Sequence, residues 1–128
     1  MIQAENNNYN IKSGYTCNLS PDHQPLEIYK VPPMSKVYQV PVYKKVREYL
    51  RKNPGSSVLE LGCGTGYKLN KYIKTDAEKV IGVDQEVCID YAKTHYQGIV
   101  WKEFDFEKEP QQFDEKSFDV IISEDVIE

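Results

Sequence analysis

The sequence contains few of the residues that would mark a disulfide-stabilised, metal-binding or membrane protein. It has 3 cysteines, Cys17, Cys63 and Cys88, and their odd number and wide spacing fit neither a disulfide framework nor a CxxC motif. We therefore expect reduced thiols. No apolar run approaches the roughly 20 residues of a transmembrane helix, and the first ten residues lack the features of a secretory signal. These absences predict a cytoplasmic protein that does not bind membranes.

Histidine is also scarce. His23 lies in a Pro-rich stretch without a Cys, Ser or Asp partner at motif spacing, and His95 falls near a predicted helix end, so we expect neither to be catalytic. Asp125 and Glu128 could bind a metal, but an acidic first helical turn explains them as well. We predict no metal site.

Basic residues are in the minority over most of the chain. Residues 1–55 contain eight Lys and Arg against four Asp and Glu, whereas residues 56–128 contain eight against sixteen. The two parts therefore carry formal charges of +4 and −8. This acidic main body argues against nucleic acid as the principal partner. Most of the basic excess lies in YKKVREYLRK at 43–52, which we interpret as the solvent face of a helix, with contact to an anionic substrate as the alternative.

Regular structure is not expected at the N-terminus. Four prolines between positions 21 and 33 interrupt any helix or strand, so residues 1–40 are predicted to form an irregular arm. A lead helix is predicted over about 41–52, where apolar residues recur at helical spacing and NPG at 53–55 ends the pattern. Its predicted apolar face consists of Val42, Val46, Tyr49 and Leu50.

Short apolar runs and helical patterns alternate in the rest of the chain. Strands are predicted at 57–61, 79–84, 98–104 and 117–123, and helices at about 66–74 and 85–96. Such alternation is typical of βαβ units and of a parallel sheet covered on both faces. We therefore predict an α/β fold with a Rossmann-like, doubly wound parallel sheet.

The sequence VLELGCGTG at 58–66 places three glycines between the first predicted strand and the helix that follows. In an open α/β sheet the ligand lies beyond the carboxyl ends of the strands, which puts this loop at the expected site. Gly62, Gly64 and Gly66 can adopt positive φ, and without a Cβ they let the backbone contact a ligand.

Two classes of ligand fit such a loop. The dinucleotide fingerprint G-x-G-x-x-G would put its third small residue at Tyr67, and it usually lacks a carboxylate two residues before the first glycine. Glu60 places a negative charge where a pyrophosphate would come near, but it would attract a ligand that carries an ammonium and a sulfonium. We therefore expect a cationic ligand, and an NAD-binding oxidoreductase is the disfavoured alternative.

The same motif resembles the first motif of the class I S-adenosylmethionine-dependent methyltransferases. The resemblance continues through VIGVD, EFDFE and FDVIISEDVIE in the order of that family, and it covers about 70 of the 128 residues. It implies that residues 41–128 are the cofactor-binding part of a methyltransferase, with S-adenosylmethionine as the cofactor. An aminopropyl transferase uses a decarboxylated form of this cofactor and has a similar glycine loop, so it is an open alternative.

The resemblance assigns one group of residues to the methionine end of the cofactor. Glu60 and the loop Gly62–Gly66, including Cys63 and Thr65, would hold the methionine part, and Glu124 would contact it as well. Glu124 has an alternative explanation, because an acidic residue is also favoured in the first turn of a helix.

A second group is assigned to the adenosine. Asp84, which ends the second strand, would accept hydrogen bonds from both ribose hydroxyls, since a carboxylate offers two oxygens to a vicinal diol. Gln85 would lie beside the adenosine, Asp105 would accept from the adenine amino group, and Phe106 would contact the ring. As alternatives, Asp84 could cap the next helix and Phe106 could belong to the core.

The segment before the first strand also resembles a known group. GYTCNLSPDHQPLEIY and YQVPVYKKV are similar to the N-terminal segment of bacterial methyltransferases that accompany glycan and surface-polysaccharide modification. In such enzymes this segment closes over the cofactor, which implies that Tyr38 and Gln39 are lid residues. We therefore predict methyl transfer to a small-molecule or glycan acceptor.

The family's sheet has seven strands, and four are predicted here. The fourth strand would lie beside the first and expose an apolar, unpaired edge, which natural proteins normally avoid. Three explanations are open: a C-terminally truncated chain, an incomplete gene product, or a module that completes its sheet with a second copy or another chain. The alternative function is therefore a cofactor-binding or assembly module without activity of its own, and no catalytic residue is predicted.

Overall fold

A computed structural model describes residues 39–103, 113–114 and 116–123 of the chain. The elements follow one another as α3 (Val40–Lys52), β1 (Ser57–Leu61), η1 (Leu69–Ile73), β2 (Lys79–Asp84), α4 (Glu86–His95), β3 (Val100–Glu103) and β4 (Val120–Ser123). Each lies at the position that the sequence predicts, although β3 and β4 are shorter. Among the described residues, no helix has the length and apolar character of a membrane span.

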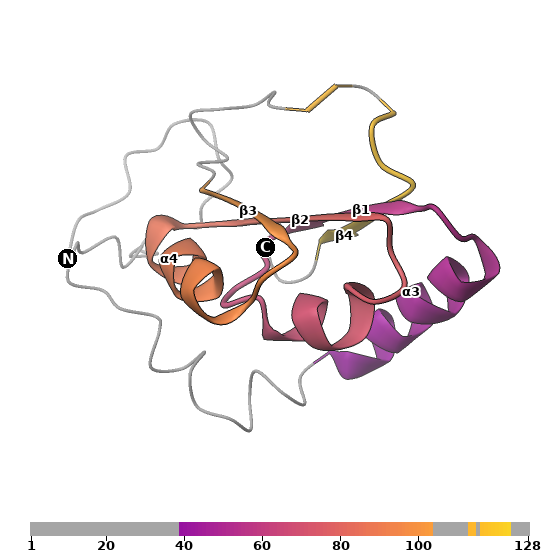
Figure 1. Ribbon diagram of the computed structural model, residues 1–128, viewed down its shortest axis with the longest axis horizontal. Helices are drawn as coiled ribbons and strands as arrows, with labels where there is room; N and C mark the ends of the chain where they lie inside the picture. The colour runs from indigo at the N-terminus through magenta and orange to yellow at the C-terminus, as the bar shows by residue number, and fades with distance from the viewer. Residues whose placement is uncertain (1–38, 104–112, 115, 124–128) are drawn as a thin grey trace, which may run out of the picture.

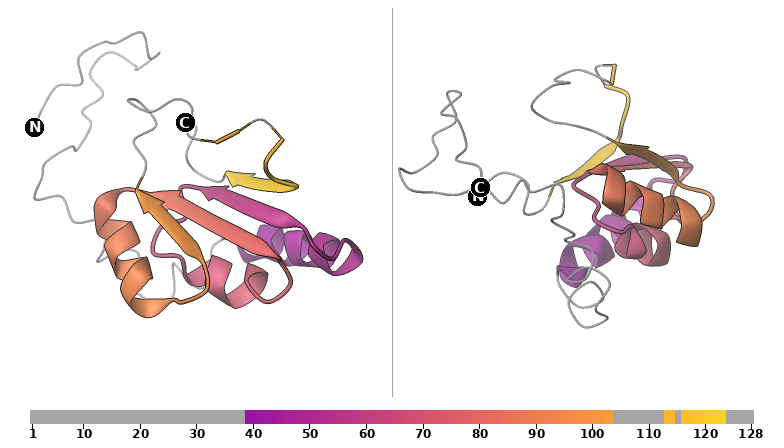
Figure 2. Two further views of the ribbon diagram at one scale, coloured as in Figure 1. Left: turned by 45° about the horizontal axis from the view of Figure 1, so that its top comes forward. Right: turned by 90° about the vertical axis from the view of Figure 1, so that its left-hand side faces the viewer.

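The described strands form one parallel sheet with the order β3-β2-β1-β4. In the register, Leu59 of β1 lies between Ile81 of β2 and Ile121 of β4. The parallel α/β sheet is therefore confirmed, and the fourth strand lies beside the first as predicted. In Figure 1 the labels β3, β2 and β1 follow one another from left to right along the sheet, and the left view of Figure 2 shows β4 beside β1 at the edge opposite β3.

The helices that the structure describes lie on one face of this sheet (Figure 2). The chain steps from β1 to β2 and then to β3 in a single direction, and right-handed crossovers in one direction place both connections on the same face. The step from β3 to β4 runs the opposite way. Its described part brings Phe113 and Phe118 to the other face, where they pack with Leu59, Ile81 and Val83. The reversal of direction lies between β1 and β4, which is where open α/β sheets bind ligands.

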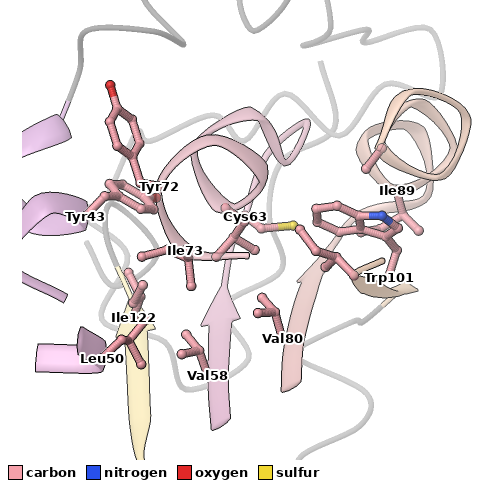
Figure 3. Packing of buried hydrophobic residues seen from close by; sticks show 13 residues of the cluster. Tyr43, Leu50, Val58, Cys63, Tyr72, Ile73, Val80, Ile89, Trp101 and Ile122 are labelled. Atoms are coloured by element: carbon pink, nitrogen blue, oxygen red, sulfur yellow. The ribbon is translucent and has the colours of Figure 1, made fainter. Parts of the chain in front are cut away.

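A core fills the space between the sheet and the helices (Figure 3). Tyr43 and Leu50 of α3 are the most buried residues of the lead helix, at 2% and 1% exposure. The predicted apolar face of this helix was therefore wrong in part, because Val42 and Tyr49 are 41% and 44% exposed. The helix carries two tyrosines on different faces, Tyr43 and Tyr49, and Tyr43 is the one that packs against η1. The basic side chains of α3 are mainly exposed, as predicted.

The helix after the glycine loop departs from the ordinary α-helix that the sequence predicts over 66–74. At η1 the Lys74 backbone N–H donates to the Leu69 carbonyl five residues earlier, at 2.9 Å, which is the π-helical pattern. This wider turn buries Leu69, Tyr72 and Ile73 together. Single π-helical turns within helices are frequent at functional sites, and this one follows the glycine loop directly.

The ring of Trp101 in β3 leaves no room for a side chain at two glycine positions. Its indole lies against Gly82 of β2 and against Gly66, and its Nε1–H donates to the Tyr96 carbonyl at 3.0 Å. A Cβ at Gly82 would come within 2.5 Å of the Trp101 ring, and a Cβ at Gly66 within 2.3 Å. The resemblance places Gly66 in the loop that would hold the cofactor, and the packing of Trp101 is a second reason for a glycine at that position.

The packing around Trp101 predicts the cost of a methyl group at position 82. We expect Gly82→Ala to lower the free energy of unfolding by about 1–3 kcal/mol, because the added Cβ overpacks a filled core. Gly82 has no positive φ, so the effect is steric. Denaturant unfolding measures it. In a Trp101→Phe background the smaller ring leaves room, and the same substitution should cost less. Equal costs in both backgrounds would contradict the assignment.

Candidate functional site

The glycine loop leaves β1 with the backbone conformation that the sequence anticipates. Gly62, Gly64 and Gly66 have φ of 75°, 56° and 83°, a region that L-residues with a side chain rarely adopt. The N–H groups of Gly62 and Cys63 both donate to the Val83 carbonyl of β2, at 2.9 and 3.1 Å. The start of the loop is therefore bound to the end of the neighbouring strand.

Asp84 holds the middle of the loop. Its Oδ2 accepts from the Gly64 N–H at 2.7 Å, and its Oδ1 accepts from the Gln85 N–H at 2.7 Å. Burial raises the pKa of the Asp84 carboxyl, and the hydrogen bonds from Gln85 and Gly64 act in the opposite direction. The side chain of Cys88 interacts with the same carboxylate, and a carboxylate oxygen has two lone-pair sites, so an oxygen can accept more than one donor. Gln85, at the start of α4, is exposed beside it.

Glu60 lies beneath the loop on the helix side of β1. Its side chain is 1% exposed, and the Tyr43 hydroxyl of α3 donates a hydrogen bond to its Oε1. The lead helix thus reaches the strand that precedes the glycines. The sequence analysis missed Tyr43. Its spacing of seven residues from the buried Leu50 was a usable signal, but Tyr49 matched a helical face equally well.

Lys68 links the start of η1 to the start of the lead helix. Its Nζ lies 4.9 Å from the centroid of the Tyr43 ring and donates to Gln39 Oε1 at 3.1 Å. Gln39, which the resemblance assigns to a lid, has a φ of 60° at the N-cap of α3. The structure therefore brings Gln39, Tyr43, Glu60 and Lys68 into one connected set of contacts.

Two buried thiols lie close to these carboxylates. Cys63 in the loop and Cys88 in α4 are free cysteines. Burial raises the pKa of Cys63 well above its ordinary value, and the negative charges of Glu60 and Asp84 raise it further. Burial and then the charge of Asp84 raise the pKa of Cys88 to about 12. The loop therefore lies in a negative electrostatic environment, which favours a cationic ligand over a pyrophosphate.

Some predicted site residues lie outside the described residues. These are Asp105, Phe106 and Glu124, together with Tyr38 of the predicted lid and the carboxylates of Asp125 and Glu128. Their roles stay predictions. Within the part of the chain that the structure describes, no three Cys, His, Asp or Glu side chains are grouped as a metal site would require.

Comparisons with known proteins agree with the geometry of the loop. A family model for a methyltransferase domain matches residues 52–128. No curated protein matches the sequence significantly. Solved structures do: a TehB-like SAM-dependent methyltransferase from Corynebacterium glutamicum is 28% identical, with a TM-score of 0.51, over 64% of this chain and 44% of that one.

Two further structures extend the comparison. The PRMT1 enzyme–prozyme heterotetrameric complex of Trypanosoma brucei with AdoHcy is 27% identical, with a TM-score of 0.54, over 74% of this chain and 30% of that one. The sugar N-methyltransferase KedS8 from Streptoalloteichus is 18% identical, with a TM-score of 0.57, over 89% and 45%. At that identity it supports the fold alone. The chain spans less than half the length of each of these three proteins.

The raised pKa values predict thiols that do not react in the folded protein. In a Cys17→Ser variant, near pH 8, we expect a thiol-specific disulfide reagent to label neither Cys63 nor Cys88, because the thiolate is the nucleophile and little of it forms. The same reagent should label both thiols rapidly in denaturant. The measurement is the time course of labelling, and fast labelling of either thiol in the folded protein would contradict the environment described above.

Proposed function

Because this chain belongs to the class I S-adenosylmethionine-dependent methyltransferases, we propose that it transfers a methyl group to a small-molecule or glycan acceptor. The cofactor of the family is S-adenosylmethionine. The observation that carries the proposal is the bond between the Gly64 backbone and the Asp84 carboxylate, 2.7 Å long. It joins the loop after β1 to the acid that ends β2, and these are the two parts that the cofactor's methionine and ribose would meet.

The residues around Asp84 fit the ribose of the cofactor. Both carboxylate oxygens already accept one backbone N–H, which fixes the orientation of the side chain before a ligand arrives. The side chain of Cys88 also interacts with this carboxylate, and the vicinal diol of a ribose would add two donors. Gln85 is exposed next to this carboxylate and would lie beside the adenosine. Asp105 and Phe106 would complete the adenine end, as the resemblance implies.

The residues beneath the loop fit the methionine end. Glu60 is buried with its carboxylate held by Tyr43, and a negative charge in a region of low dielectric attracts a cation more strongly than it would in water. The backbone of Gly62–Gly66, with Cys63 and Thr65, would surround the methionine, and the resemblance implies that Glu124 would contact it as well. A dinucleotide would instead bring its pyrophosphate toward the carboxyl group of Glu60.

The chemistry that the cofactor supplies is an electrophilic methyl group: a lone pair of the acceptor forms a bond to this carbon while the carbon–sulfur bond breaks and its electron pair passes to the sulfur. The task of the chain is then to hold the reacting groups in line, and alignment alone contributes a large part of such rate enhancements. The acceptor's proton leaves to solvent. The resemblance of the N-terminal segment to glycan-modifying methyltransferases supports the acceptor class.

A second candidate function rests on β4. This strand lies at an edge of the described sheet, and Ile121 in it is 60% exposed. Apolar edge strands are normally covered, which supports a module that becomes active when a second copy or another chain pairs with β4. Activity that rises with protein concentration, together with dimers in light scattering, would favour this function. A fully active monomer would exclude it.

The proposed function predicts selective cofactor binding. In calorimetric titration we expect S-adenosylmethionine to bind and NAD not to bind. Asp84→Ala should weaken binding by about 1–3 kcal/mol, because charge-assisted hydrogen bonds to the ribose are lost. Asp119 provides a matched control, since its carboxylate accepts from the Ser57 N–H at 2.8 Å at the start of β1, at the opposite end of the strand from the glycine loop.

Asp119→Ala should leave cofactor affinity unchanged. Equal losses in the two variants would indicate general damage to the sheet and would contradict the role of Asp84. Binding of NAD in place of S-adenosylmethionine would overturn the proposed function. The acceptor class is tested separately, by following formation of S-adenosylhomocysteine with sets of sugars, small metabolites and peptides. Turnover with peptides alone would contradict the acceptor that we propose.

A further inference from the structure

The lead helix is joined to the cofactor site by one side chain. Tyr43 lies on α3, 17 residues before Glu60, and its hydroxyl donates to Glu60 Oε1. Both side chains are buried, at 2% and 1% exposure. A contact between the helix that precedes the sheet and the carboxylate at the glycine loop is not required by the α/β fold itself, so it calls for an explanation.

The tyrosine ring is held on several sides. The centroid of the Tyr43 ring lies 6.4 Å from that of Tyr72 in η1. Lys68 Nζ lies 4.9 Å from the centroid of the Tyr43 ring. Lys68 in turn donates to Gln39 Oε1 at the start of the same helix. These contacts fix the position of the phenol oxygen. A donor fixed in this way also fixes the direction of the carboxylate that accepts from it.

Packing alone does not account for the hydroxyl. A phenylalanine at position 43 would fill the same space in the core and would keep the contacts of the ring. The hydroxyl adds a hydrogen bond to Glu60, and donation to a buried carboxylate stabilises its charged form. The functional consequence of this bond is therefore the orientation of the Glu60 side chain.

We propose that Tyr43 is a positioning residue for the cofactor's methionine end: its hydroxyl holds the Glu60 carboxyl group in one orientation, so that this group attracts the ligand's ammonium. This inference rests on the proposed function, and it extends that function to the helix before the sheet. The inference also divides the site into two parts. Binding of the ribose depends on Asp84, whereas binding of the ammonium depends on Glu60 and, through Glu60, on Tyr43.

Three ligands and two variants test the inference. S-adenosylmethionine and S-adenosylhomocysteine both carry the ammonium, whereas 5′-methylthioadenosine lacks the whole amino-acid part and keeps the ribose. In calorimetric titration we expect Tyr43→Phe to lower the affinity for the first two ligands by about tenfold, which is the effect of losing one hydrogen bond to a carboxylate. Binding of 5′-methylthioadenosine should not change.

Tyr72→Phe is the matched control. It removes a hydroxyl from the neighbouring tyrosine of the same core cluster, where the ring contacts Tyr43, and it should leave all three affinities at the wild-type level. Thermal unfolding of both variants establishes that they are folded. If Tyr43→Phe does not fold, Glu60→Gln replaces it, since this substitution keeps the size of the side chain and removes its charge, and the same pattern of ligands is expected.

The outcomes separate this inference from the proposed function. If the wild-type protein binds none of the three ligands, the proposed function fails. If the wild type binds and Tyr43→Phe weakens all three ligands equally, or none of them, the positioning role is wrong while the proposed function stands. A loss confined to S-adenosylmethionine would also overturn it, because the attraction would then be to the sulfonium.

Discussion

The hydrogen bond between the Gly64 backbone and the Asp84 carboxylate is the interaction on which the candidate site depends. It connects the loop after β1 to the end of β2, beyond the point where the two strands stop pairing. The Val83 carbonyl adds two bonds to the beginning of the loop. With these contacts in place, the loop is held by the sheet itself, and the Asp84 carboxylate has a defined orientation.

Two carboxyl groups lie at different depths in this arrangement. Asp84 lies at the open end of the sheet, where its carboxylate can still accept donors, whereas Glu60 is buried on the helix side beneath the loop. The thiol of Cys63 lies near both, and both charges raise its pKa. A ligand with hydroxyl donors at one end and a positive charge at the other would interact with both Asp84 and Glu60. An adenosine joined to a cationic amino acid has this form, whereas a dinucleotide carries a negatively charged pyrophosphate.

The sequence was sufficient for the parts that depend on local pattern. Apolar runs of five or six residues predicted β1 and β2 closely, because strands covered on both faces are apolar at nearly every position. The parts that depend on packing between elements were not predictable in this way. The choice of Tyr43 over Tyr49 requires knowledge of where η1 lies, and the hydrogen bond to Glu60 joins elements that no local pattern relates. The sequence also does not reveal that the Trp101 ring lies against Gly66.

Trp101 gives the protein an optical property. It is the only tryptophan in the chain, and its ring lies against the last glycine of the loop and against β2. Indole emission responds to the polarity and the motion of its surroundings, and light that excites the indole but not the 10 tyrosines reports on a single place under the glycine loop. The molecule thus carries its own spectroscopic label beside the site, and any change in the packing of the loop alters the light that the protein emits.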